Sequence, residues 1–265
     1  MRLGPIIASG TRSTVHRCGD DHVAKVPLPS TPDRWIRDEA AYTRAVRAAG
    51  APAPRLIDVV EHDDRPVGIY ERIDGPSLWE LIHREPARAA AYGEMLAEVH
   101  LRVFAIGAPI TLPRQRDRLS GKVHRAAHLT GLDVVAALEL IPRGGPANGL
   151  CHGDLHPANV LMSERGPVLV DWFDACRGAP LGDVARTSLL IGAPEVTDVA
   201  HLPGADPDTL VTLHDSYLAR IAADAPFDAE EFRRWRRVEA AARLAEGVEP
   251  AGLLRVWRDE DAALV

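Results

Sequence analysis

The sequence of 265 residues lacks a paired cysteine motif, an apolar run long enough to cross a bilayer and an excess of basic residues. Its three cysteines, Cys18, Cys151 and Cys176, form no C-x-x-C pair, and residues 1–13 lack the apolar stretch of a signal peptide. We therefore expect reduced thiols in a cytoplasmic protein. No segment approaches the roughly 20 apolar residues that span a membrane, so we expect no membrane contact. The net charge of -7 argues against a nucleic-acid partner, which usually requires a basic surface.

The remaining composition is that of an ordinary globular chain, with 46% hydrophobic and 26% charged residues. Its length suffices for one large domain or for two lobes, and we find no internal repeat or low-complexity tail. Strand-like segments occupy much of the first quarter, and helical segments dominate the rest. Three helices are expected to finish the chain, the middle one over residues 227–247.

One helix within the first quarter carries a carboxylate where an apolar residue is expected. Residues 31–50 predict a helix with Thr31 as its N-cap and Gly50 as its terminator. At helical spacing, Glu39 shares a face with Trp35, Tyr42 and Val46. Because a buried carboxylate is costly without a cation or donor, Glu39 requires a partner.

The segment CHGDLHPANVLM, residues 151–162, and the strand PVLVDW, residues 167–172, place three oxygen-bearing side chains together. The two segments, joined by SERG, predict a hairpin. That pairing would bring Asp154, Asn159 and Asp171 close together. Carboxylate and amide oxygens suit Mg²⁺, and Asp154 would remain free to accept or orient the proton of a hydroxyl. Turn capping is the alternative role for such residues.

HGDLHPANVL resembles the H-G-D-x-x-x-x-N form of a kinase catalytic loop, and VDWFDA resembles its metal-binding D-F-G counterpart. Together with Lys25, Glu39 and RGAPLGDVART, they resemble the aminoglycoside phosphotransferase and choline kinase family. The resemblance implies an α+β, bilobal, protein-kinase-like fold. The N-lobe, residues 1–74, would be a small antiparallel sheet with one helix that binds the nucleotide. The C-lobe, residues 75–265, would be larger and mainly helical, with the catalytic loop and substrate-binding helices.

The resemblance also implies a role for each matched residue, with ATP and Mg²⁺ as cofactors. Asp154 would be the catalytic base or hydroxyl-orienting group, and Asn159 and Asp171 would bind the metal. Lys25 would pair with the phosphates and be oriented by Glu39. The remaining contacts would come from the phosphate-covering turn and from the hinge, namely Gly10, Ser13, Glu71 and Ile73.

The acceptor implied by the family is a hydroxyl of a small molecule, with aminoglycosides and other amino sugars or amino alcohols as the cationic candidates. Antibiotic resistance is a candidate role that the family name alone does not establish. The phosphate loop has one glycine, Gly153 replaces the Arg of protein kinases, and Trp172 replaces Phe, so a protein kinase is the weaker alternative. A nucleotide-binding pseudokinase or scaffold module is the other. The preference for ATP over GTP and the oligomeric state stay open.

Several nearby polar residues are open to plainer interpretations. We expect Asp174 to be an exposed turn residue, with a second metal or substrate contact as the alternative, and Asp183 to cap a helix or brace the catalytic loop. His152 is expected to be an orienting core residue, and with Cys151 and His156 it lacks the fourth ligand of a zinc site. A basic cluster is expected to be a solvated face, with an anionic ligand as the alternative: Arg114, Arg116, Arg118, Lys122 and Arg125. Acidic residues near the C-terminus are expected at the surface, with contact to a cationic substrate as the minor alternative: Asp259, Glu260 and Asp261.

Overall fold

The computed structural model describes residues 3–141, 148–192, 204, 206–247 and 250–259. Its first part is a five-stranded sheet of order β1-β2-β3-β5-β4, in which every neighbouring pair is antiparallel. Because β3 lies between β2 and β5, Lys25 at its centre is flanked on both sides by backbone. The strands are Ile6–Ser9, Ser13–Cys18, His22–Pro27, Leu56–His62 and Arg65–Glu71 for β1 to β5.

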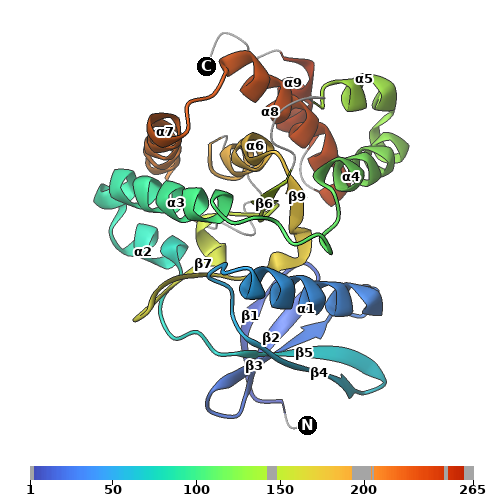
Figure 1. The fold of residues 1–265 in the computed structure, drawn as a ribbon, viewed down its shortest axis with the longest axis vertical. Coiled ribbons are helices and arrows are strands. Elements are labelled where there is room, and N and C mark those ends of the chain that lie inside the picture. The colour runs from blue at the N-terminus through green and yellow to red at the C-terminus, as the bar shows by residue number, and fades with distance from the viewer. Residues whose placement is uncertain (1–2, 142–147, 193–203, 205, 248–249, 260–265) are drawn as a thin grey trace.

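Helix α1 (Asp33–Ala48) lies between this sheet and the helical part of the chain (Figure 1). Its buried face repeats at helical spacing and includes Glu39, as the sequence predicted. The expected N-cap is wrong, because the N-cap position is Pro32, which offers no side-chain acceptor. The Thr31 hydroxyl instead donates to Arg12 O at 2.6 Å, so it ties the start of α1 to the turn between β1 and β2.

The remainder of the chain is mostly helical and packs around α6 and α8 (Figure 1). The α-helices are Leu78–Arg84 (α2), Ala89–Phe104 (α3), Gln115–Thr130 (α4), Val134–Glu139 (α5), Pro180–Ile191 (α6), Pro207–Asp224 (α7), Ala229–Arg243 (α8) and Pro250–Arg258 (α9). The 3₁₀ turns are Pro86–Arg88 (η1), Pro157–Asn159 (η2), Trp172–Asp174 (η3) and Leu244–Glu246 (η4). Helix α4 was not foreseen, although Leu119, Val123 and Ala126 already repeat there at helical spacing and are buried.

Two small antiparallel pairs present the central loops. Strands β7 (Val160–Ser163) and β8 (Gly166–Leu169) form the predicted hairpin, with Val160 opposite Leu169. Strands β6 (Gly149–Cys151) and β9 (Cys176–Gly178) form the other pair. The chain between β6 and β7, and the chain after β8, therefore emerge beside each other and next to α6.

The hydrophobic core is divided unequally. A large cluster fills the helical part, whereas the sheet buries a small one formed by Ala24, Val67 and Ile69. Helix α6 is buried on nearly all sides from Gly182 to Ile191, so its polar residues must find partners inside the protein. In the part of the chain that the structure describes, every helix is too short or too polar to cross a membrane.

Candidate active site

The loop between β6 and β7 is held by Asp183 of α6. Its carboxylate accepts hydrogen bonds from His152 N at 2.6 Å and Gly153 N at 2.8 Å, and it lies 3.0 Å from His100 Nε2. Asp183 therefore braces the loop, one of the two roles expected for it, and His152 is a buried core residue as predicted. Gly153 adopts a φ of +79°, and a Cβ there would lie 2.2 Å from Asp174 O. Only glycine fits this position without rearrangement.

Asp154 and Asn159 are joined across the loop, and Asp171 lies two residues after the end of β8. Asn159 Nδ2 donates to Asp154 O at 2.9 Å, and Val170 N donates to Asn159 O at 3.0 Å. Asp171 has a left-handed backbone with φ of 63°, an uncommon conformation for a non-glycine residue. Its side chain is 43% exposed, so the carboxylate is accessible to a ligand. The structure thus brings the three predicted residues into one site.

Lys25 connects the sheet to this loop. Its Nζ lies 2.6 Å from Glu39 Oε1 and 3.2 Å from Asp171 Oδ1. Burial alone would lower the pKa of Lys25, but the charges of Asp171 and Glu39 raise it above its ordinary value, so the amine stays protonated. Glu39, 5% exposed on α1, has thus found the cation that its position required.

The remaining predicted contacts lie in the β1–β2 turn, at the end of β5 and in the segment that follows it. Gly10 N closes the β1–β2 turn by donating to Ser13 O at 2.9 Å. Glu71 ends β5, donates through its backbone N to Arg55 O at 2.9 Å, and binds Arg165 of the β7–β8 turn at 2.7 Å. The backbone amide and the carboxylate of Glu71 therefore both have hydrogen-bond partners within the protein. Ile73, half-buried, lies just beyond β5 in the segment that leads to α2.

Asp154 is also bound by a cation that the sequence did not single out. Arg186 of α6 donates through Nη2 to Asp154 Oδ1 at 2.8 Å and through Nη1 to Glu246 Oε1 at 2.8 Å. Burial would raise the pKa of Asp154, but the opposing charges of Arg186 and His156 hold that pKa well below its ordinary value. The carboxylate is therefore fully ionised at neutral pH.

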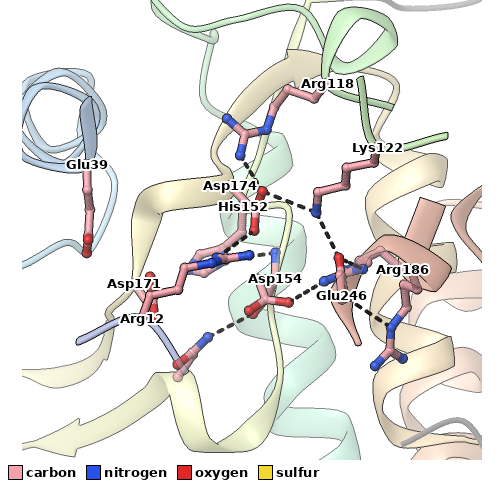
Figure 2. A network of polar contacts seen from close by, with 12 residues as sticks. Arg12, Glu39, Arg118, Lys122, His152, Asp154, Asp171, Asp174, Arg186 and Glu246 are labelled. Carbon is pink, nitrogen blue, oxygen red and sulfur yellow. Dashed lines mark hydrogen bonds and ion pairs between the residues drawn. The ribbon is translucent and has the colours of Figure 1, made fainter. Parts of the chain in front are cut away.

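Lys122 of α4 extends this network away from Asp171 and Glu39 (Figure 2). Its Nζ lies 2.9 Å from Glu246 Oε1 and 3.2 Å from Asp174 Oδ1. Charged contacts thus run without a break from Asp154 through Arg186, Glu246 and Lys122 to Asp174. Desolvation would raise the pKa of Glu246, but Arg186 and Lys122 lower it to about 2.

Asp174 overturns two expectations. It is 4% exposed and so is not an exposed turn residue. It binds Arg118, Lys122 and Arg12, so two members of the basic cluster on α4 turn inward and do not form a solvated face. Arg12 comes from the β1–β2 turn, and its guanidinium lies 4.8 Å from the Phe173 ring centroid. These contacts tie that turn to the chain after β8.

The site presents two oxygen donors that could hold a metal ion, one from Asn159 and one from Asp171. Asn159 uses its amide nitrogen within the loop, which leaves its amide oxygen as a potential ligand beside the accessible carboxylate of Asp171. Two hard oxygen donors fit Mg²⁺, which keeps several of its ligands as water or phosphate. Among the described residues no group of three His, Cys, Asp or Glu side chains could hold a metal.

Sequence reasoning missed Arg12, Lys122, Arg186 and Glu246 as members of this network. Arg186 offered a signal, because it follows Asp183 by three residues within a nearly continuous apolar helix, where a buried cation requires an anion. Of the acids near the C-terminus, Asp259 lies 3.9 Å from Arg237, outside this network. Glu260 and Asp261 lie outside the described residues.

Comparison with known proteins agrees with this geometry. The model of the phosphotransferase enzyme family APH matches residues 5–210. A search of curated protein sequences found no match. Among solved structures, the chain is similar to a type VIII aminoglycoside-3'-phosphotransferase, with a TM-score of 0.63, 18% identity and coverage of 90% of this chain and 91% of that one.

Two further structures support the same fold. One is the aminoglycoside phosphotransferase APH(3'')-Id from Streptomyces rimosus, with a TM-score of 0.60, 18% identity and coverage of 92% of each chain. The other is the streptomycin–ATP ternary complex of APH(2'')-IIa, with a TM-score of 0.58, 16% identity and coverage of 97% of this chain and 91% of that one. The antiparallel sheet, the helical remainder and these neighbours confirm the protein-kinase-like fold. The chain therefore belongs to the phosphotransferase enzyme family APH and is a small-molecule kinase.

Proposed function

We propose that this protein transfers the γ-phosphoryl group of ATP, with Mg²⁺, to a hydroxyl of a small molecule. The observation that carries the proposal is Lys25, which contacts both Glu39 of α1 and Asp171, beside the loop that holds Asp154. Lys25 is fixed between the carboxylates of Glu39 and Asp171, and Asp171 is itself exposed. This arrangement is suited to binding nucleotide phosphates and their metal. The ATP complex of the streptomycin-binding relative supports the choice of nucleotide.

In this proposal each predicted residue keeps its role. Lys25 binds the phosphates, and Glu39 holds its amine in place. The turn with Gly10 and Ser13 covers the phosphates through backbone N–H groups other than that of Gly10, which already donates to Ser13 O. The segment from Glu71 to Ile73 contacts adenine, with the lobes meeting near residue 74. Because Glu71 N already donates within the sheet, Ile73 is the better candidate for the adenine contact.

Asn159 and Asp171 would hold Mg²⁺, which neutralises charge on the phosphate oxygens when bound. The acceptor oxygen forms a bond to the γ-phosphorus while the bond to the β–γ bridging oxygen breaks, and ADP leaves with that electron pair. The hydroxyl proton passes to the carboxylate of Asp154 and from there to water. Because Arg186 keeps the pKa of Asp154 low, the carboxylate acts chiefly by orienting the hydroxyl and takes the proton late.

The ligands of the solved relatives define the first group of acceptors to test. These relatives were solved in complex with streptomycin, gentamicin and kanamycin, all aminoglycosides. Other amino sugars and amino alcohols complete the cationic part of that group. Neutral and anionic hydroxyl compounds belong beside them, because fold similarity below 25% identity does not carry substrate choice.

The test is acceptor-dependent ADP formation by the purified protein, with mass spectrometry of the phosphorylated product. Asp154→Asn should lower transfer about a thousandfold. It should leave ATP affinity close to that of the parent, because Lys25, Asn159 and Asp171 remain. Asp117→Asn, an exposed acid on α4, is the matched control. Equal turnover in Asp154→Asn and the parent would overturn the proposed role.

A further inference from the structure

Around Asp174 the cations are more exposed than the carboxylate that they bind, whereas Asp154 and Glu246 are more exposed than Arg186. Arg118 and Lys122 have side chains 18% and 11% exposed, whereas the Asp174 carboxylate between them is 5% exposed. Arg12, which also binds Asp174, is 36% exposed. A molecule that approaches Asp154 from the side of Asp174 therefore meets guanidinium and ammonium groups before it meets Asp174.

The charges of this network do not cancel. Five cations contribute to it, namely Arg12, Arg118, Lys122, Arg186 and Arg243. Three carboxylates pair with these cations: Asp154, Asp174 and Glu246. Burial raises the pKa of Glu239 of α8 to about 7, so that group carries only part of a charge at neutral pH. Within these ion pairs the cations outnumber the carboxylates by five to three, although the whole chain has a net charge of -7.

A second observation indicates that the positive charge is incompletely satisfied. Arg186, 3% exposed, uses both terminal amino groups for Asp154 and Glu246, but its Nε has no hydrogen-bond partner among the described residues. The Nε atoms of Arg220 and Arg233 are in the same state, so this donor is available to an acceptor but does not by itself require one. The acceptor could be an oxygen of a bound molecule.

We propose that the hydroxyl acceptor of this kinase carries an anionic group, a carboxylate or a phosphate, which binds to Arg118 and Lys122 while its hydroxyl meets Asp154. This inference rests on the proposed function and narrows its acceptor. A polycationic aminoglycoside is excluded as the preferred acceptor. Its ammonium groups would have to displace Arg12, Arg118 and Lys122 from Asp174, or Lys122, Arg186 and Arg243 from Glu246.

A cationic acceptor and an anionic acceptor differ in the ion pairs of the protein that must break when they bind. Removing one partner from a buried ion pair leaves an uncompensated charge, so the exchange of an internal guanidinium for a ligand ammonium gains little. An anionic group instead adds a pair to cations that are already oriented and partly exposed. The protein's own cations thus occupy the acids that a cationic acceptor would need.

The first experiment uses the unaltered protein with a non-hydrolysable ATP analogue and Mg²⁺. Calorimetry compares four probes that differ in charge: glucose 6-phosphate, glucuronate, glucose and kanamycin. At least one anionic sugar should bind about tenfold more tightly than glucose and kanamycin, and its affinity should fall as salt rises. The phosphate and carboxylate arms separate the two anionic chemistries. Equal or tighter binding of kanamycin, or binding of neither anionic sugar, overturns the inference.

The second experiment locates the contact. Lys122→Gln combined with Arg118→Gln should raise the dissociation constant of the preferred anionic sugar about tenfold or more and leave that of the ATP analogue unchanged. Arg116→Gln, an exposed arginine of the same helix, is the matched control. A weakened ATP analogue with an unchanged sugar would mean that these cations serve the nucleotide, and the inference would fail.

Failure of the inference is distinguishable from failure of the proposed function. If ADP formation depends on Asp154 but aminoglycosides are the better acceptors, phosphotransfer stands and the acceptor class is wrong. If an anionic sugar binds through Arg118 and Lys122 but no acceptor-dependent ADP forms, the binding site stands and the proposed reaction is wrong.

Discussion

Arg186 Nη2 lies 2.8 Å from Asp154 Oδ1, so the central carboxylate of the site is held by a buried cation from α6. The same helix holds the loop backbone through Asp183. Position and ionisation of Asp154 are therefore both set by α6, whose all-round burial leaves it little freedom to move. Arg186 acts through Asp154 and is a positioning residue.

Arg186→Gln should reduce kcat about tenfold to a hundredfold and move the acidic limb of the pH–kcat/KM profile to higher pH. The direction follows because Arg186 lowers the pKa of Asp154, and its removal lets that pKa rise. Arg186→Lys keeps the charge and should restore the limb in part. An acidic limb at the same pH in Arg186→Gln, measured on a folded sample, would contradict the coupling.

Lys25→Ala should raise the KM for ATP about tenfold or more, because it removes the cation between Glu39 and Asp171. Glu39→Gln should have an effect in the same direction, since it acts through Lys25. The double variant should be little worse than Lys25→Ala alone, because residues of one ion pair are not additive. Arg17→Ala, exposed on β2, is the control, and additive losses would argue that the two residues act separately.

Asp171→Asn should weaken Mg²⁺-dependent binding of the ATP analogue while binding in the presence of EDTA changes little. The physical reason is the loss of one charged ligand from a two-donor site completed by phosphate and water. Calorimetric titrations with and without Mg²⁺ measure the difference. An undiminished gain in affinity on adding Mg²⁺ would remove Asp171 from the metal site.

Local sequence patterns predicted those parts of the site that can be recognised from a short stretch of sequence. Helical periodicity placed Glu39 on the buried face of α1, and the hairpin SERG brought Asn159 near Asp171. The ion pairs of Arg118 and Lys122 could not be predicted from such local patterns. Arg118 meets Asp174 across 56 residues and Lys122 meets Glu246 across 124, so each pair becomes apparent only when the helices are packed.

This dependence on helix packing also explains why the expectations for Asp174 and for the basic cluster were wrong. Asp and basic residues near turns are usually solvated, and local sequence does not reveal that α4 packs against α8 and η4. The sequence pattern of α4 did not predict a helix, because its apolar stripe is narrow and lies among charged residues. A charged residue inside a helix with an apolar stripe is therefore worth examining as a buried ion-pair partner.

Glu239→Gln should stabilise the protein increasingly as pH rises from about 4.5 to about 7. Burial raises the pKa of Glu239 to about 7 in the folded protein, so over this range the unfolded chain loses the proton while the folded one keeps it. Ionisation thus opposes folding, and glutamine removes the cost. The gain in free energy of unfolding at pH 8 relative to pH 4 should be about 2–3 kcal/mol, measured by urea unfolding.

Glu246→Gln supplies the opposite case in the same network. Arg186 and Lys122 lower the pKa of Glu246 to about 2, so its stabilising charge is fully present above about pH 4.5 and is lost as pH falls toward 2. The variant should lose about 2–3 kcal/mol at pH 7, and the loss should shrink on acidification. Glu94→Gln, an exposed residue of α3, should change neither value. Arg186 and Lys122 act on both carboxylates, but burial outweighs them at Glu239 and not at Glu246. Parallel pH dependence in the two variants would contradict that difference.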